Sequence, residues 1–186
     1  MDKKPDAAQE VRQTLMTLRI IVFSLAMGVS IFLGYTLTMD ADAAEAGNAP
    51  GLWLYLAIFA GMALMARVVV PQVLFAGIRR RIAHGNWQPA TKNGPPAPQT
   101  DEGLLMAALQ LRTIIGCALL EGAAFANAYA FMVERQVASL AIVLALILMI
   151  ASHFPLRFWL DGWLERQKRW LDEERSLETV DRTKSL

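Results

Sequence analysis

The sequence predicts an all-α protein: a four-helix transmembrane bundle made of two hairpins, followed by an amphipathic cytosolic C-terminal helix. Of the 186 residues, 55% are hydrophobic, and the mean hydropathy is +0.34. Soluble chains usually contain about 45–50% apolar residues. The apolar residues are concentrated in long runs, and most basic residues lie before the first run, between the second and third runs, or after the fourth. These observations favour a single integral membrane domain over residues 1–186.

Four apolar runs are long enough to cross a bilayer, which takes about 20 helical residues. They cover residues 20–39, 52–70, 113–133 and 137–154. The runs lack the period-two alternation of barrel strands, and a helix satisfies its own backbone in lipid. The first run is longer than the apolar core of a signal peptide and follows a mixed-charge stretch, so we expect it to remain as a span.

The basic residues predict the orientation of these spans. All lysines and arginines except Arg135 lie before the first run, between the second and third runs (counting Arg67, near the cytosolic end of the second run), or after the fourth. The segment 40–51 contains three acidic residues and no basic one. Because positive flanks stay in the cytosol, we expect a multi-pass protein of the bacterial inner (cell) membrane with both termini in the cytosol.

Three further features concern the cytosolic side. Residues 85–100 are rich in Gly, Pro, Asn and Gln and predict a flexible linker. Apolar helical pattern continues before Arg19 and Arg112 and after Arg67. The helices should therefore project into the cytosol as a short bundle or lie along the membrane surface, with these arginines near the inner headgroups.

Residues 156–178 predict an amphipathic helix, since apolar side chains recur there at three- and four-residue spacing. Three Trp residues on one face favour a helix in the inner membrane interface, and the alternative is packing against the cytosolic projections of the protein itself. We expect the following side chains to anchor the protein at lipid, including anionic headgroups: Arg79, Arg80, Arg81, Trp159, Trp163 and Trp170.

Small residues at four-residue spacing predict where helices approach closely in lipid. The third span carries Ala118, Gly122, Ala126 and Ala130, and the first span carries Ala26, Ser30 and Gly34. These faces could meet within one chain, in a homo-oligomer, or against another membrane protein.

Glu121 is the residue that most needs a chemical explanation, because a carboxylate near the middle of a span is costly and marks a functional site by default. It follows Arg112 by roughly 13 Å along the helix axis. It could be neutral, pair with Arg67 of the second span, or face a hydrated cavity. Its role could be a clamp between helices, a proton- or cation-linked function, or contact with a partner or lipid. Asn127 lies in the same span at a different azimuth.

The stretch Ala118-Leu-Leu-Glu-Gly-Ala-Ala-Phe125, with Ala128-Tyr129 after it, resembles a segment of uncharacterised, planctomycete-like bacterial membrane proteins with several spans. That resemblance implies no function. The same stretch is similar to the proton-carrying helix of rotary ATP synthase ring subunits. The glycine-repeat helix of those subunits is missing from the first span, and the expected topology places the hairpin turns on the opposite side.

The remaining composition limits the function classes. Cys117 is the single cysteine and the net charge is +1, so neither a redox pair nor a bulk field towards nucleic acid is expected. His84 and His153 are far apart in the sequence, and we expect no metal, cofactor or catalytic constellation. Two classes stay open: a non-enzymatic membrane scaffold or accessory subunit, and a small transporter or channel that uses Glu121.

Overall fold

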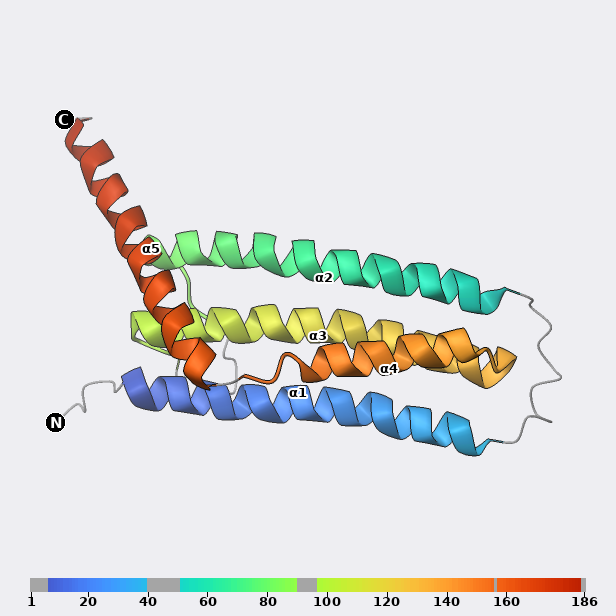
Figure 1. Ribbon diagram of the computed structural model, residues 1–186. Coiled ribbons are helices and arrows are strands. Elements are labelled where there is room, and N and C mark those ends of the chain that lie inside the picture. Colours follow the sequence, from blue (N-terminus) through green and yellow to red (C-terminus); the bar gives the residue numbers. More distant parts are fainter. Residues whose placement is uncertain (1–6, 40–50, 90–96, 156, 185–186) are drawn as a thin grey trace. The chain divides into compact units, whose positions relative to one another are not determined.

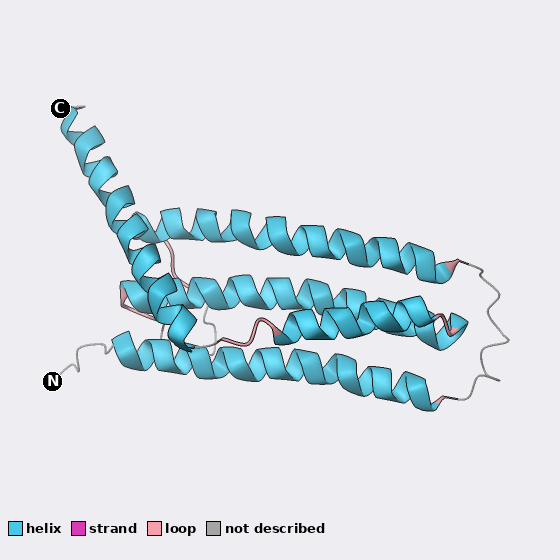
Figure 2. Ribbon diagram, viewed as in Figure 1, coloured by secondary structure: helices cyan, strands magenta, loops and turns pink. Residues whose placement is uncertain are grey.

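The computed structural model describes residues 7–39, 51–89, 97–155 and 157–184, with backbone alone for residues 157–159, 161 and 177–184. Within these residues every regular element is a helix (Figure 2), so the all-α class is confirmed. In chain order (Figure 1) the helices are α1 (Ala7–Thr38), α2 (Leu52–Ala83), α3 (Asp101–Glu134), α4 (Val137–Ala151) and α5 (Arg157–Lys184). The predicted outer loop and the centre of the predicted linker fall in residues 40–50 and 90–96, outside the described residues.

Among the residues that the structure describes, three helices are long and apolar enough to cross a membrane. They are α1, α2 and α3, with 32, 32 and 34 residues. The fourth apolar helix, α4, has 15 residues and ends at Ala151, and residues 152–154 continue from it in turns bonded to its last carbonyl groups. The α4 helix alone is therefore about 22 Å long, shorter than the hydrocarbon core of about 30 Å.

The chain forms two compact units. One contains residues 1–18, 72–112 and 155–186, and we call it the terminal unit. The other contains residues 19–71 and 113–154, and we call it the span unit because it includes the predicted spans. Helices α1, α2 and α3 each contribute residues to both units.

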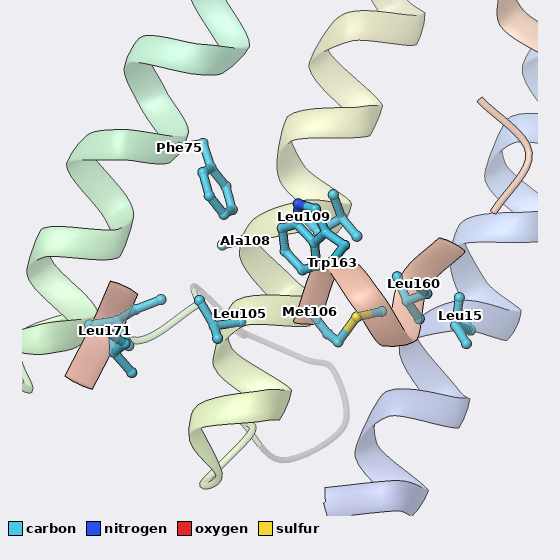
Figure 3. Close-up of a cluster of buried hydrophobic side chains, with 10 residues drawn as sticks. Leu15, Phe75, Leu105, Met106, Ala108, Leu109, Leu160, Trp163 and Leu171 are labelled. Carbon is cyan, nitrogen blue, oxygen red and sulfur yellow. The ribbon is translucent and has the colours of Figure 1, made fainter. Parts of the chain in front are cut away.

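The terminal unit has its own hydrophobic core, to which four helices contribute (Figure 3). A side chain of this kind stabilises the fold by about 1.5–3 kcal/mol when it leaves water. The buried side chains are Leu15 of α1, Phe75 and Ile82 of α2, Leu105, Met106, Ala108 and Leu109 of α3, and Leu160, Trp163 and Leu171 of α5. The ends of the predicted spans therefore form a short helical bundle, one of the two arrangements that the sequence left open.

Helix α5 packs on the other helices of this unit through the face that was predicted to meet lipid. Trp163 is 5% exposed, and its ring centroid lies 5.7 Å from that of Phe75. Arg79 donates two hydrogen bonds to Glu174, at 2.8 and 3.2 Å, and its guanidinium lies 5.0 Å from the centroid of the Trp170 ring. Trp163 and Arg79 thus contact protein where the sequence suggested lipid, because the apolar face of α5 meets the apolar faces that continue along α1, α2 and α3.

The other predicted anchors have a different environment. Arg80 and Arg81 are exposed on α2, and Trp170 is 47% exposed beside Arg79. The side chain of Trp159 lies outside the described residues. A lipid contact thus stays a prediction for Arg80 and Arg81.

Two ion pairs join the start of α3 to α5. Lys168 bonds to Glu102 at 2.5 Å, and Arg175 donates two hydrogen bonds to Asp101 at 2.7 and 2.9 Å. The hydrogen bond from Arg175 lowers the pKa of Asp101 below its ordinary value. Both pairs are partly exposed, so each contributes little stability, about 0.2–1 kcal/mol, and mainly fixes which residues of the two helices face each other.

Two helix ends in this unit are closed by specific groups. After α2, Gly85 has a φ of +68°, and the amides of Gly85 and Asn86 bond to the carbonyl oxygens of Ile82 and Arg81. This is a Schellman ending, which requires the left-handed conformation that glycine adopts without strain. Before α3, the Glu10 carboxylate accepts hydrogen bonds from the amides of Gln99 and Thr100 and from the Thr100 hydroxyl.

Replacing Trp163 with alanine should destabilise the terminal unit by about 3–5 kcal/mol, because a large buried ring is lost and leaves a cavity. Hydrogen exchange of the α5 backbone amides in the full-length protein measures this loss. Trp170→Ala is the matched control, since that ring is half exposed and its removal should cost much less. If both substitutions changed the hydrogen exchange of α5 equally, the conclusion that α5 packs on the protein through Trp163 would be wrong.

Candidate functional site

Glu121 lies on α3 within the span unit, where α3 passes α1. Its Oε1 atom is 3.6 Å from the position that a Cβ atom would occupy at Gly28 of α1. Because Gly28 has no side chain, the carboxylate can lie close to the α1 backbone. The Glu121 side chain is half-buried, so part of it faces the outside of the unit, which is hydrocarbon if this segment spans the membrane.

Aromatic rings complete this contact between α1 and α3. Phe125 follows Glu121 by one turn, and its Cζ atom lies 3.9 Å from the same Cβ position at Gly28. Phe32 follows Gly28 by one turn on α1, and its ring meets the Phe125 ring edge to face, with centroids 5.3 Å apart and an interplanar angle of 64°. The Glu121 carboxylate and the Phe125 ring thus pack directly against Gly28, where α1 and α3 approach each other.

The carboxylate of Glu121 has no hydrogen bond or ion pair with any residue that the structure describes. The pairing with Arg67 that the sequence suggested is not formed. Arg67 on α2 instead bonds through Nη2 to Nε2 of His153, at 2.6 Å. The stem of Arg67 lies against α3, with its Cγ atom 3.7 Å from the Cβ position at Gly116.

The partners of His153 define its tautomer. Nδ1 lies 2.7 Å from the carbonyl oxygen of Met149, which can only accept, so Nδ1 carries the proton. Nε2 is then the lone-pair nitrogen that accepts from Arg67. A neutral His153 therefore joins the end of α4 to α2. Next to it, the guanidinium of Arg19 lies 5.6 Å from the centroid of the Phe154 ring, which joins the same segment to α1.

Asn127 acts as a clamp between α3 and α2, apart from Glu121. It is fully buried, and its Nδ2 donates to the carbonyl oxygens of Leu56 and Ala123 at 3.0 and 2.9 Å. Because both neighbours are acceptors, the amide orientation is determined. Bonds of this kind between helices in lipid contribute about 0.6–2 kcal/mol. Asn127 therefore has a structural explanation, which Glu121 lacks.

The predicted small-residue faces pack only in part. On α3, Ala118 and Gly122 are exposed, Ala126 is half-buried and Ala130 is fully buried. On α1, Ala26 is half-buried, whereas Ser30 and Gly34 are exposed. Four residues turn a helix by about 400°, so a stripe at this spacing rotates by about 40° at each step and cannot stay on one interface. The close packing of α3 uses neighbouring small residues instead, namely Gly116, Ala123, Ala124 and Ala128.

The sequence analysis missed the role of the turn between α3 and α4. Glu134 accepts hydrogen bonds from the amides of Gly51, Leu52 and Trp53, at 3.2, 2.8 and 2.9 Å, and so caps the start of α2. Arg135 donates to the carbonyl oxygens of Thr36 and Met39 at the end of α1. The signal was an adjacent acid and base in a three-residue turn between two apolar runs.

Each of these charges has the sign that stabilises the helix end it meets. The carboxylate lies at the positive end of the α2 dipole, and the guanidinium lies at the negative end of the α1 dipole. Arg135 reaches its partners from a backbone with φ of +54°, which is uncommon for a residue other than glycine. One turn thus closes the ends of two other helices.

Among the described residues, no group of three His, Cys, Asp or Glu side chains could hold a metal ion. Cys117 is a free, buried thiol on α3. The chain matches no known family model, no curated protein and no solved structure. The geometry of its own residues is therefore the basis for any functional proposal.

Replacing Glu134 with alanine should lower the stability of the span unit by about 1–3 kcal/mol, because three amides at the start of α2 lose their acceptor. Glu134→Gln should cost less, since its amide oxygen can still accept. Thermal unfolding in a mild detergent measures both changes. Gln136→Ala is the control, because the Gln136 side chain makes no capping bond. If Glu134→Ala unfolded at the same temperature as Gln136→Ala, the hydrogen bonds of Glu134 would contribute no stability to the span unit.

Proposed function

We propose that this chain is a non-enzymatic integral membrane scaffold or accessory subunit, with the terminal unit as its platform for a partner. The observation that carries the proposal is the separate core of the terminal unit, to which α1, α2, α3 and α5 all contribute. A protein that only needed to cross the bilayer would not require a second core formed by the extensions of its spans. The outer surface of this platform is charged and includes Arg12, Arg80, Arg81 and Arg169.

The polar residues of the span unit support this class over a channel. Ser30 and Thr36 donate to carbonyl oxygens of their own helix, and Asn127 donates to α2 and α3. Arg67 and His153 bond to each other. Most of the hydrogen bonds that these side chains make are therefore to the protein itself, although Asn127 Oδ1, Arg67 Nε and Ser139 Oγ are buried without a hydrogen-bond partner.

The topology that we propose is four spans with both termini in the cytosol of a bacterial cell. Residues 19–71 leave the terminal unit from α1 and return to it with α2, and residues 113–154 leave from α3 and return before α5. A segment that begins and ends on one side crosses the membrane an even number of times, so α4 would complete the second pair. Of the described basic residues, only Arg19, Arg67 and Arg135 belong to the span unit, which supports a cytosolic terminal unit.

Cysteine labelling in intact cells tests this topology. In a Cys117→Ala background, a membrane-impermeant maleimide should label Gln136→Cys in the α3–α4 turn and spare Ser176→Cys on the exposed face of α5. Both should react after the cells are opened. Labelling of Ser176→Cys in intact cells, or protection of Gln136→Cys, would contradict the proposed arrangement.

The scaffold function predicts a stoichiometric partner. Purification from native membranes in a gentle detergent, followed by mass measurement of the intact complex, should show a second protein in a fixed ratio. Arg80→Glu with Arg81→Glu should release it if the exposed basic end of α2 contributes to docking, whereas Gly34→Ala on the span unit should not. Recovery of a lone monomer or a homo-oligomer would count against the scaffold function. The same mass measurement would identify anionic lipids that bind Arg80 and Arg81.

A small transporter that uses Glu121 is the second candidate. One observation favours it: the carboxylate has no partner among the described residues, whereas the nearby Arg67 is already bonded to His153. Uptake of protons or cations into liposomes, compared between the wild-type protein and Glu121→Gln, tests this function directly. Equal uptake by the two proteins would reject it.

A further inference from the structure

The hydrogen bond between Arg67 and His153 can form only while the imidazole is neutral. Nδ1 of His153 donates to the carbonyl oxygen of Met149, so Nε2 holds the lone pair that accepts from Nη2 of Arg67, at 2.6 Å. A second proton on the ring would go to Nε2, because no other ring nitrogen has a free lone pair. Nε2 and Nη2 would then both be donors on positively charged groups, and repulsion would replace the bond.

Arg67 makes no second hydrogen bond within the part of the chain that the structure describes. Its Nε atom is buried without a partner, and its Cγ atom lies 3.7 Å from the Cβ position at Gly116 of α3. A guanidinium that loses its acceptor in apolar surroundings raises the free energy of the folded state. Separation of the end of α4 from α2 would allow water to reach both cations, so this is the response that the geometry favours.

The charged and titratable groups around this imidazole come from three helices. Helix α2 contributes Arg67, and α1 contributes Arg19, whose guanidinium lies 5.6 Å from the centroid of the neighbouring Phe154 ring. On α3, the ionisable residues that follow the contact with Arg67 are Cys117, a buried thiol, and Glu121. Helix α4 itself contains no ionisable side chain. The two guanidinium groups oppose protonation of the ring, whereas a charged Glu121 would favour it.

We propose that Arg67 and His153 form a pH-sensitive switch, which fastens the end of α4 to α2 when the imidazole is neutral and releases it when the imidazole is protonated. Histidine is the side chain that ordinarily titrates between pH 5 and 8. The fastened state requires the neutral ring, so it is favoured at higher pH and is lost as the pH falls. Because one proton is taken up, the equilibrium shifts by at most tenfold per pH unit.

The switch goes beyond the scaffold function, because it depends on contacts within the span unit alone. Helix α4 ends at Ala151, and the turns of residues 152–154 carry the switch. The chain passes into the terminal unit at residue 155, so the released segment is the one that connects α4 with α5. Under the topology proposed above, this end of α4 lies at the cytosolic face, and acidification of the cytosol is the signal that the switch reads.

Nitrogen-15 NMR of the imidazole rings tests the chemical basis of the switch in the full-length protein reconstituted in lipid. The chain contains two histidines, and His84→Gln assigns their signals. We expect His153 to be the neutral Nδ1–H tautomer at pH 8 and to become doubly protonated as the pH is lowered to 5. An Nε2–H tautomer at pH 8, or a ring that is still neutral at pH 5, would overturn the proposal.

The distance between spin labels on α2 and α4 tests the movement. In a Cys117→Ala background, labels on Val69→Cys and Ala151→Cys occupy exposed positions near Arg67 and His153. At pH 8 we expect one narrow distance distribution in nanodiscs. At pH 5.5 a second, longer distance should appear, with a population at least fivefold larger than at pH 8. Identical distributions at the two pH values would overturn the proposal.

Four substitutions distinguish the switch from a general effect of acid. Arg67→Gln should abolish the pH response, because the amide can donate to neutral Nε2 and accept from protonated Nε2. His153→Gln should also abolish it, because its amide oxygen accepts from Arg67 at every pH. His84→Gln and Glu121→Gln should retain the response, since neither residue makes the bond. A full pH response in both Arg67→Gln and His153→Gln, or its loss in His84→Gln, would show that another group is the sensor.

Discussion

The arrangement of this protein depends on one constraint: four separate stretches of the chain share the core of the terminal unit. Leu15, Phe75, Met106 and Trp163 come from four different helices and are buried in that one cluster. Between these contributions the chain runs through the span unit twice, in residues 19–71 and in residues 113–154. Each of these two stretches contains parts of two helices.

The span unit contains helix ends of its own, and these must be closed as well. Backbone groups at a helix end need partners, and a helix dipole favours a particular charge at each end. Glu134 and Arg135 satisfy both needs for α1 and α2 from a turn that belongs to neither helix. Glu10, in the first turn of α1, accepts hydrogen bonds from the amides of Gln99 and Thr100 just before α3, and Thr100 Oγ1 accepts from the α3 amide of Gly103. Hydrogen bonds near helix ends thus link the helices within each unit, in addition to the packing along their length.

Hydropathy and charge predicted the apolar helices well, because length and composition alone determine whether a helix can cross a bilayer. They could not predict what α5 would meet, since an apolar face offers the same chemistry to lipid as to another helix. The position of Trp163 depends on tertiary packing with Phe75, which no local pattern contains. Within one chain the Ala118–Ala130 stripe is buried only in part, because four-residue spacing drifts around a helix. Asn127 and Glu121 were both found as unusual residues, but only the geometry separates a clamp from an unpaired carboxylate.

The short α4 helix and its turn also bear on how such a chain enters a bilayer during synthesis. With 15 residues, α4 is too short to partition into hydrocarbon efficiently by itself. The turn before it carries one negative and one positive charge, so moving it across the membrane transfers no net charge. Helix α3 emerges from the ribosome first and is long enough to insert. Under the four-span topology proposed above, the second hairpin enters as one unit, with α3 drawing α4 into the membrane behind it.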